Sequence, residues 1–361
     1  MPGTWNLADL FEAVTDAVGD REAVVVGDTR LGYSDLDGRA NRTAHLLAAH
    51  GVGPGDRVGI ALRNGHEHLS ALLGAYKLGA VPFNVNYRYT AAEMAYLLRD
   101  ATPRVLLHGP DLGEAVDPAV AEVGDEGIDV TALIGRGPDH EARLAEQDHR
   151  RPPAEGRSDD DLYLLYTGGT TGMPKGVEWR HHDIVFAALG AGQGATVLTG
   201  EATAPPATPT ELVARAVEGR ARVVVASPLI HGTAQWVALA TLLGGGTVLM
   251  LPSSTFSPEA LWDLAATERA GAVVVVGDAF SRPLVDVLAR DPDRWDLSHL
   301  VAFVSGGAVL SPIVRDDLND LLPWAAVADG YGTSETGGQG NTVTWPGQQP
   351  SRAARFPLGS H

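Results

Sequence analysis

Cysteine is absent from this chain of 361 residues. The absence excludes disulfide bonds, thiolate catalysis and cysteine-ligated zinc. No apolar run approaches the roughly 18 residues that a membrane-spanning helix needs, so no membrane span is expected. Residues 1–9 lack a basic segment followed by an apolar one, so a secretory signal is not expected either, and the predicted location is cytoplasmic.

Positive charge is also scarce, since the formal net charge is −18. An acidic surface of this kind repels nucleic acid, which we therefore do not expect as a partner. An anionic ligand would need local positive charge from a loop or a metal ion. The length predicts two α/β units in place of one small core.

Lysine is nearly missing, because Lys77 and Lys175 are the two lysines among 27 basic residues. Lys175 lies in the segment YTGGTTGMPKG, residues 166–176, which contains four glycines and three threonines. The apolar residues 162–165 before it predict a buried strand. Backbone N–H groups, hydroxyls and one compact cation together suit a polyphosphate.

This segment differs from a Walker loop, in which the lysine directly follows glycine and opens a helix. Here Pro174 precedes Lys175 and Gly176 follows it, and both residues disfavour an immediate helix. On composition alone, a flexible turn without a ligand stays an alternative.

Strand and helix patterns alternate along the chain, which predicts parallel sheets with helices on both faces. Ser34 is predicted as the N-cap of a helix that reaches about residue 50, and Thr90 with Glu93 predicts a capping box. The expected hairpin joins residues 23–26 and 31–33. Further strands are expected at 57–62, 105–108, 130–134, 222–226, 272–276 and 300–304.

The glycine-rich segment resembles the phosphate-binding signature of the adenylate-forming (ANL) superfamily, which includes acyl-CoA synthetases, luciferases and peptide-synthetase adenylation domains. Three further segments resemble motifs of that family in the same order: PLIH at 228–231, VSGGA at 304–308 and DGYGTSET at 329–336. The resemblance runs from about residue 7 to about residue 341. It is strongest for the acyl-CoA synthetase or AMP-dependent ligase branch.

This resemblance implies an α/β fold, an AMP-binding N-terminal domain of two interleaved α/β subdomains. One would cover approximately 55–200, and the other approximately 7–54 plus 220–340. Residues 341–361 would be a tail or the start of an incomplete third subdomain. The family's ribose-binding motif and the lysine of its mobile C-terminal domain have no match, so we expect an N-terminal portion of a longer enzyme that is poorly active alone.

The implied reaction activates a carboxylic acid with ATP and Mg²⁺ to an acyl-adenylate, followed by thioester formation with CoA. Two alternatives stay open: an adenylation half-reaction that passes the acyl group to a carrier-protein thiol or another ligase, and a non-catalytic nucleotide-binding module. A homodimer is possible.

The resemblance also implies roles for individual residues. The β- and γ-phosphates would be held by Thr167, Gly168, Gly169, Thr170, Thr171, Gly172 and Lys175. The adenine side would be formed by Gly306, Gly307, Ala308, Asp329, Gly330, Tyr331 and Gly332. Thr333 would contact the α-phosphate and Glu335 would bind magnesium, so the catalytic set is Lys175, His231, Thr333 and Glu335. Thr170 and Thr171 could instead cap their own turn.

His231 is implied to contact the acid, although a structural histidine is the alternative. Gln235, Trp236, Asp278 and Phe280 are implied to line the acyl pocket, and Trp236 could equally be core. Segments 177–180, 230–236 and 276–280 are similar to ligases for bulky lipid, steroid-side-chain or polycyclic acids. Asp278 could also anchor an amino group, so an amino-acid substrate stays open.

Overall fold

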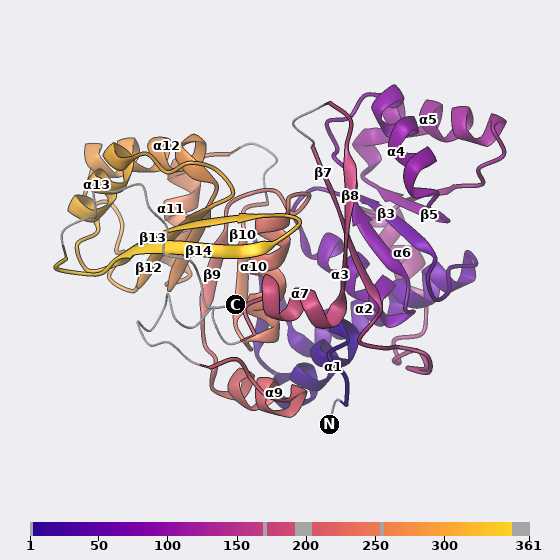
Figure 1. Ribbon diagram of the computed structural model, residues 1–361, viewed down its shortest axis with the longest axis horizontal. Coiled ribbons are helices and arrows are strands. Elements are labelled where there is room, and N and C mark those ends of the chain that lie inside the picture. Colours follow the sequence, from indigo (N-terminus) through magenta and orange to yellow (C-terminus); the bar gives the residue numbers. More distant parts are fainter. Residues whose placement is uncertain (1–2, 169–171, 192–203, 253–255, 349–361) are drawn as a thin grey trace. The chain divides into compact units, whose positions relative to one another are not determined.

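The computed structural model describes residues 3–168, 172–191, 204–252 and 256–348. They form two compact α/β units (Figure 1). Unit 1 comprises Met1–Arg21, Leu31–Ile184 and Leu229–His231. Unit 2 comprises Glu22–Arg30, Val185–Pro228 and Gly232–His361. The chain therefore passes between the units several times.

Unit 1 contains a parallel four-stranded sheet in the order β4-β3-β5-β6. Its strands are nearly continuous apolar runs, as is typical of parallel strands covered on both faces. They are β3 (Arg57–Ala61), β4 (Val81–Asn84), β5 (Val105–His108) and β6 (Thr131–Ile134). The helices are α1 (Leu7–Val18), α2 (Tyr33–Ala49), α3 (His66–Lys77), α4 (Ala91–Ala101), η1 (Pro110–Leu112, 3-10), α5 (Gly113–Asp125) and α6 (Pro138–Ala145).

A separate antiparallel ribbon in unit 1 flanks the glycine-rich loop. Strand β7 (Leu162–Thr167) pairs with β8 (Lys175–Arg180), and Thr167 lies opposite Lys175. Helix α7 (His181–Ala187) follows directly. The predicted buried strand is confirmed, and Lys175 opens a strand and not a helix, as its neighbours Pro174 and Gly176 predicted.

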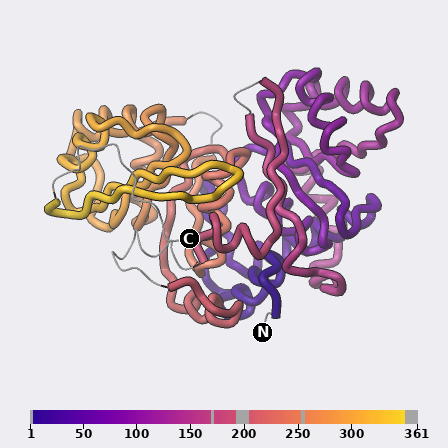
Figure 2. Tube along the Cα trace, viewed as in Figure 1, coloured from indigo at the N-terminus to yellow at the C-terminus, as the bar shows by residue number. Residues whose placement is uncertain are grey.

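Unit 2 contains an eight-stranded sheet in the order β14-β13-β12-β11-β9-β10-β1-β2. In Figure 2 the last described residues, drawn in yellow, double back as the antiparallel pair β13 and β14. The strands are β1 (Glu22–Val26), β2 (Thr29–Gly32), β9 (Arg222–Val225), β10 (Thr247–Met250), β11 (Ala272–Val275), β12 (Ala302–Gly306), β13 (Ala326–Thr333) and β14 (Gly337–Thr344). The helices are α9 (Pro209–Glu218), α10 (Gly232–Leu243), α11 (Pro258–Thr267), α12 (Gly277–Arg290) and α13 (Pro312–Leu321).

The core of unit 2 lies between this sheet and the helices α11, α12 and α13. Trp262 and Phe303 are fully buried in it. The Trp262 indole donates a hydrogen bond to the Leu284 carbonyl at 3.0 Å, which satisfies its polar atom inside the core.

Two local predictions have different outcomes. The capping box is confirmed, because Thr90 Oγ1 accepts from the Glu93 N–H and Glu93 Oε2 accepts from the Thr90 N–H. The predicted N-cap Ser34 is wrong: α2 starts after Gly32, whose N–H donates to Asp35 Oδ2 at 3.0 Å. Asp35 is the third residue after this N-cap and accepts from its N–H, whereas the glycine has no side chain that could accept from the first turn in return.

The units also differ from the expected subdomains, which joined residues 7–54 to 220–340. Helices α1 and α2 pack on α3 and belong to unit 1. Only Glu22–Arg30 joins unit 2, because β1 pairs in parallel with β10.

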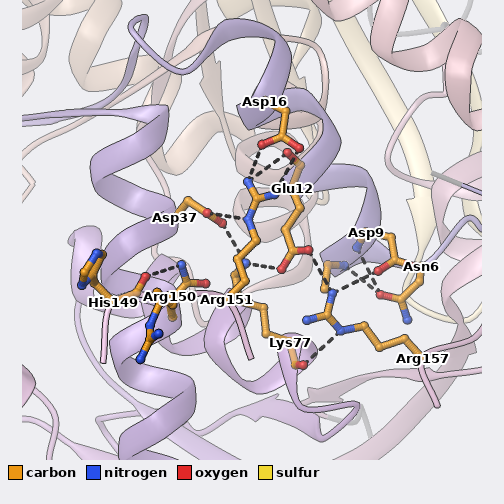
Figure 3. Close-up of polar contacts among 12 residues, drawn as sticks. Asn6, Asp9, Glu12, Asp16, Asp37, Lys77, His149, Arg150, Arg151 and Arg157 are labelled. Carbon is orange, nitrogen blue, oxygen red and sulfur yellow. Dashed lines mark hydrogen bonds and ion pairs between the residues drawn. The ribbon is translucent and has the colours of Figure 1, made fainter. Parts of the chain in front are cut away.

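Unit 1 encloses a network of ion pairs that links α1, α2 and α3 to residues 148–158 (Figure 3). Lys77 lies at its centre with Glu12 and Asp37. Among the described residues, none of the helices has both the length and the apolar content to cross a membrane.

Candidate active site

Two of the recognised motifs become neighbours at one edge of the unit 2 sheet. Strands β12 and β13 pair in parallel, with Ser305 opposite Asp329 and Gly306 opposite Gly330. Both motifs therefore start at the carboxyl ends of parallel strands, where ligands bind in open α/β sheets. The structure thus brings the whole set expected around adenine into one part of unit 2.

The loop after β12 needs small residues. Gly307 has φ +83°, and a Cβ there would lie 2.9 Å from Thr233 Oγ1. Gly277 has φ +58°, and a Cβ there would lie 2.8 Å from the Ala308 side chain. The Gly277 N–H donates to Ser305 Oγ at 3.0 Å. These contacts hold residues 305–308 against the starts of α10 and α12, at spacings that larger residues would disrupt.

Three side chains at the end of β13 and in the turn after it are exposed to solvent. Tyr331 is 52% exposed, and Thr333 and Glu335 are exposed as well. Thr333 Oγ1 lies 2.9 Å from Thr336 Oγ1 in the turn between β13 and β14. An exposed aromatic face, a hydroxyl and a carboxylate at the end of one strand pair are available to a ligand.

Glu335 is a single carboxylate, and the part of the chain that the structure describes contains no group of three metal-binding side chains. Mg²⁺ commonly takes one or two protein carboxylates and completes its shell with phosphate oxygens and water. Glu335 therefore fits a magnesium ion that arrives with a nucleotide better than a resident metal centre.

Asp329 differs from its neighbours because it is buried. Burial raises the pKa of Asp329 to about 6, against the lowering effect of Arg315 and with a further increase from Asp278. Removal from water disfavours the charged carboxylate. The group therefore changes its charge close to neutral pH.

In unit 1, the β7–β8 ribbon presents the predicted phosphate-binding residues. Thr167 and Gly168 end one side, and the exposed Lys175 begins the other. Gly172 has φ +118°, a conformation that favours glycine. Gly169, Thr170 and Thr171 lie outside the described residues.

His231 lies in a three-residue segment, Leu229–His231, that belongs to unit 1 although the chain on either side belongs to unit 2. The side chain is exposed, yet neighbouring protein displaces part of its water and lowers the pKa of His231, and the positive charge of Arg88 acts in the same direction. The imidazole is therefore neutral at pH 7 and has one N–H donor.

Two asparagines that sequence reasoning missed hold this segment. The Leu229 N–H donates to Asn64 Oδ1 at 2.7 Å, and Asn84 Nδ2 donates to the Ile230 carbonyl at 2.7 Å. Asn84 is the last residue of β4, and Asn64 follows β3. The available signal was a polar amide at the carboxyl end of a buried apolar strand.

The expected acyl-pocket residues have mixed surroundings. Gln235 is buried in α10, and the half-buried Trp236 has an Nε1 that finds no hydrogen-bond partner among the described residues. Asp278 Oδ1 accepts from the Ser311 N–H at 2.8 Å, immediately before α13. Phe280 lies edge-on to Phe256 and packs on the unit 2 core. Asp278 and Phe280 therefore have structural contacts whatever they do for a ligand.

The two α/β units with these motifs have the fold of the N-terminal domain of acyl-CoA synthetases. The chain belongs to the AMP-binding enzyme family, whose model matches residues 11–359. The inhibitor-bound N-terminal domain of FACL13 from Mycobacterium tuberculosis superimposes with a TM-score of 0.76 at 26% identity, covering 94% of this chain and 79% of that one.

Two curated relatives are similar over most of this chain. The 3-oxocholest-4-en-26-oate–CoA ligase of Rhodococcus rhodochrous is 38% identical over 346 residues, which is 92% of this chain and 60% of that protein. The medium-chain acyl-CoA ligase Mig of Mycobacterium avium is 38% identical over 363 residues, covering 93% and 64% respectively. The chain thus spans under two thirds of the length of these relatives.

Proposed function

We propose that this chain binds ATP and a bulky hydrophobic carboxylic acid and joins them as an acyl-adenylate. In a protein of the relatives' length, the acyl group then passes to CoA as a thioester. One observation carries the proposal: the in-register pairing of the SGGA and DGYGTSET strands in a member of the AMP-binding enzyme family.

The chemistry assigns a role to each exposed polar group. A carboxylate oxygen attacks the α-phosphorus, and the bond to the pyrophosphate oxygen breaks. Negative charge on the phosphate oxygens is stabilised by preorganised donors and cations. In this proposal the ammonium group of Lys175 and the N–H groups of Gly168 and Gly172 meet the β- and γ-phosphates, with Gly169, Thr170 and Thr171 of the same loop.

The Thr333 hydroxyl donates to the α-phosphate, and the Tyr331 ring stacks on adenine beside Gly306 and Gly330. Glu335 would hold Mg²⁺, which supplies positive charge to the triphosphate. The neutral His231 donates its N–H to the acid and orients the attacking oxygen. Orientation of this kind is a large part of the acceleration available to such a reaction.

The substrate class is supported by two findings. Both relatives described above are named for the activation of large or medium-length apolar acids. The buried Trp236 Nε1 lacks a partner among the described residues, and a donor of this kind is costly to bury unless something accepts from it. A polar group on the acid, such as a ring ketone, is our proposed acceptor, with Gln235 and Phe280 along the apolar part.

Exchange of radiolabelled pyrophosphate into ATP tests the proposal across fatty, aromatic, steroid-side-chain and amino acids. We expect exchange with the bulky apolar acids and little with acetate or amino acids. Exchange without CoA consumption would point to another acceptor, such as a carrier-protein thiol. Absence of exchange, together with no binding of a non-hydrolysable acyl-adenylate analogue, would reject the function.

A further inference from the structure

Asn84 makes more hydrogen bonds than a surface asparagine needs. The residue is buried, with only 5% of its surface exposed. Its Oδ1 accepts from the Tyr166 N–H at 2.8 Å, and its Nδ2 donates to the Tyr166 carbonyl at 2.7 Å and to the Ile230 carbonyl at 2.7 Å. Both amide donors are used, and all three bonds lie within unit 1.

The first two bonds reproduce what a neighbouring strand would do. A side-chain amide that pairs with the N–H and the carbonyl of one residue fixes that peptide as a ladder partner does. Tyr166 is fixed on its other side too, because its hydroxyl donates to Asp100 at 2.6 Å. Tyr166 is the second-last residue of β7. The glycine-rich loop therefore begins next to a residue whose backbone and side chain are both held by hydrogen bonds.

The third bond reaches a segment that is distant in sequence. Ile230 directly precedes His231, and Leu229 is held by Asn64. The chain enters this segment from unit 2 and returns to unit 2 after it. Its placement in unit 1 thus depends on buried side-chain contacts and on two asparagine amides.

We propose that Asn84 is a positioning residue that fixes the stem of the glycine-rich loop and the His231 segment to each other. One amide holds both, so the phosphate-binding loop and the group that orients the acid keep a constant relation. The ligands of the two segments rest on the proposed function, whereas the mechanical link does not. Asn64 serves the His231 segment alone.

Three variants separate the bonds. Asn84→Ala removes all three. Asn84→Asp keeps the shape and an acceptor for the Tyr166 N–H but places carboxylate oxygens against two carbonyl groups. Asn64→Ala releases Leu229 and leaves Tyr166 untouched, so it is the matched control.

Hydrogen exchange of the present chain measures the link without any ligand. We expect faster exchange in peptides covering 163–168 and 229–233 for Asn84→Ala, and only in the second peptide for Asn64→Ala. Asn84→Asp should loosen 229–233 more than 163–168. Faster exchange of one segment alone in Asn84→Ala, or a uniform increase across the chain, would overturn the proposal.

Binding of a non-hydrolysable acyl-adenylate analogue supplies the second readout. Misplacement by about 1 Å costs on the order of 100-fold in reaction rate at such sites. We take that as the upper limit for affinity, so Asn84→Ala should weaken binding by about 10- to 100-fold, and more than Asn64→Ala does. If wild-type protein does not bind, the proposed function fails while the exchange result stands. If wild type and Asn84→Ala bind equally, the positioning role fails and the function survives.

Discussion

The two lysines of this chain have opposite surroundings within the same unit. Lys77 ends α3 with a side chain that is 0% exposed, and its Nζ lies 2.7 Å from Asp37 and also pairs with Glu12 (Figure 3). Lys175 begins β8, is exposed, and makes no ion pair with the residues that the structure describes. A buried cation is neutralised by the protein itself, whereas an exposed one beside a glycine-rich loop remains available to an anion.

The charged groups around Lys77 are paired with one another. Arg157, with a side chain 2% exposed, pairs with Asp9 and Glu12, and Arg151 pairs with Asp37 and Asp16. Each central carboxylate is thus shared between two cations. Removal of one cation leaves carboxylates buried with too little compensation, which is the costly way to break a buried ion pair. Replacement of Lys77 should therefore reduce stability, whereas replacement of Lys175 should reduce activity.

Lys77→Met tests the buried lysine and should have the largest effect. We expect the free energy of unfolding to fall by about 3–5 kcal/mol, because Glu12 and Asp37 lose a buried partner. Chemical denaturation followed by circular dichroism measures the change. Arg99→Met is the control, since Arg99 pairs with Glu122 and Glu126 at the surface and should change stability little. Equal stability of Lys77→Met and wild type would show that the network is dispensable.

Lys175→Ala tests the exposed lysine. We expect pyrophosphate exchange to drop by roughly 100- to 1,000-fold, the usual cost of losing one preorganised group that stabilises transition-state charge. The unfolding transition should stay close to that of wild type, because Lys175 is exposed and makes no ion pair with the described residues. A large loss of stability with activity retained would reverse the comparison between the two lysines.

Glu335→Gln sharpens the comparison within unit 2. The amide keeps the size of the side chain and removes its charge, so the Mg²⁺ concentration for half-maximal exchange should rise by about tenfold or more. Titration of Mg²⁺ at saturating ATP measures this shift. Glu259→Gln on α11 is the matched control and should leave the midpoint unchanged. An unchanged midpoint for Glu335→Gln would remove this residue from the proposed metal site.

The sequence could predict the parts of this protein that depend on local pattern. The apolar run 162–165 predicts a buried strand, and Pro174 and Gly176 predict that no helix starts at Lys175; the structure has strand β7 at the first place and strand β8, which was not predicted, at the second. The sequence could not predict which helices and strands pack together, so it kept residues 7–54 in one subdomain, whereas only Glu22–Arg30 joins unit 2 and helices α1 and α2 belong to unit 1. Nor does local pattern show that Lys77 is buried, because its burial is decided by helices that pack together only in the folded chain.

The same limit applies to Asn84, whose partners are 82 and 146 residues away. A polar residue at the end of an apolar strand has many possible partners, and nothing in its neighbours selects Tyr166 and Ile230. The motif residues were easier to identify because a phosphate loop and a strand-end turn each carry their chemistry in a few consecutive residues. Their roles remain proposals that the variants above test.

Asp329→Asn should have the smallest effect. It extends the comparison to a group that is buried like Lys77 but is proposed to contact the ligand like Lys175. The pKa of about 6 means that Asp329 is ionised above that pH and protonated below it. If the carboxylate accepts from the adenine amino group, affinity for the acyl-adenylate analogue should rise by about fivefold as pH increases through 6. The reason is that a hydrogen bond to a charged acceptor contributes about 1 kcal/mol more than one to a neutral group.

Stability should move in the opposite direction. A carboxyl group whose pKa is raised by folding stabilises the folded state while it is protonated, and this contribution is lost as pH rises from about 4 through 6. Calorimetric binding and thermal unfolding between pH 4 and 8 measure the two slopes on the same samples. Asp329→Asn should flatten both, because the amide does not titrate. If the pH dependence of binding persists in Asp329→Asn, another group is responsible for it. Asp329 would then be a buried structural residue that does not contact the ligand, as Lys77 is.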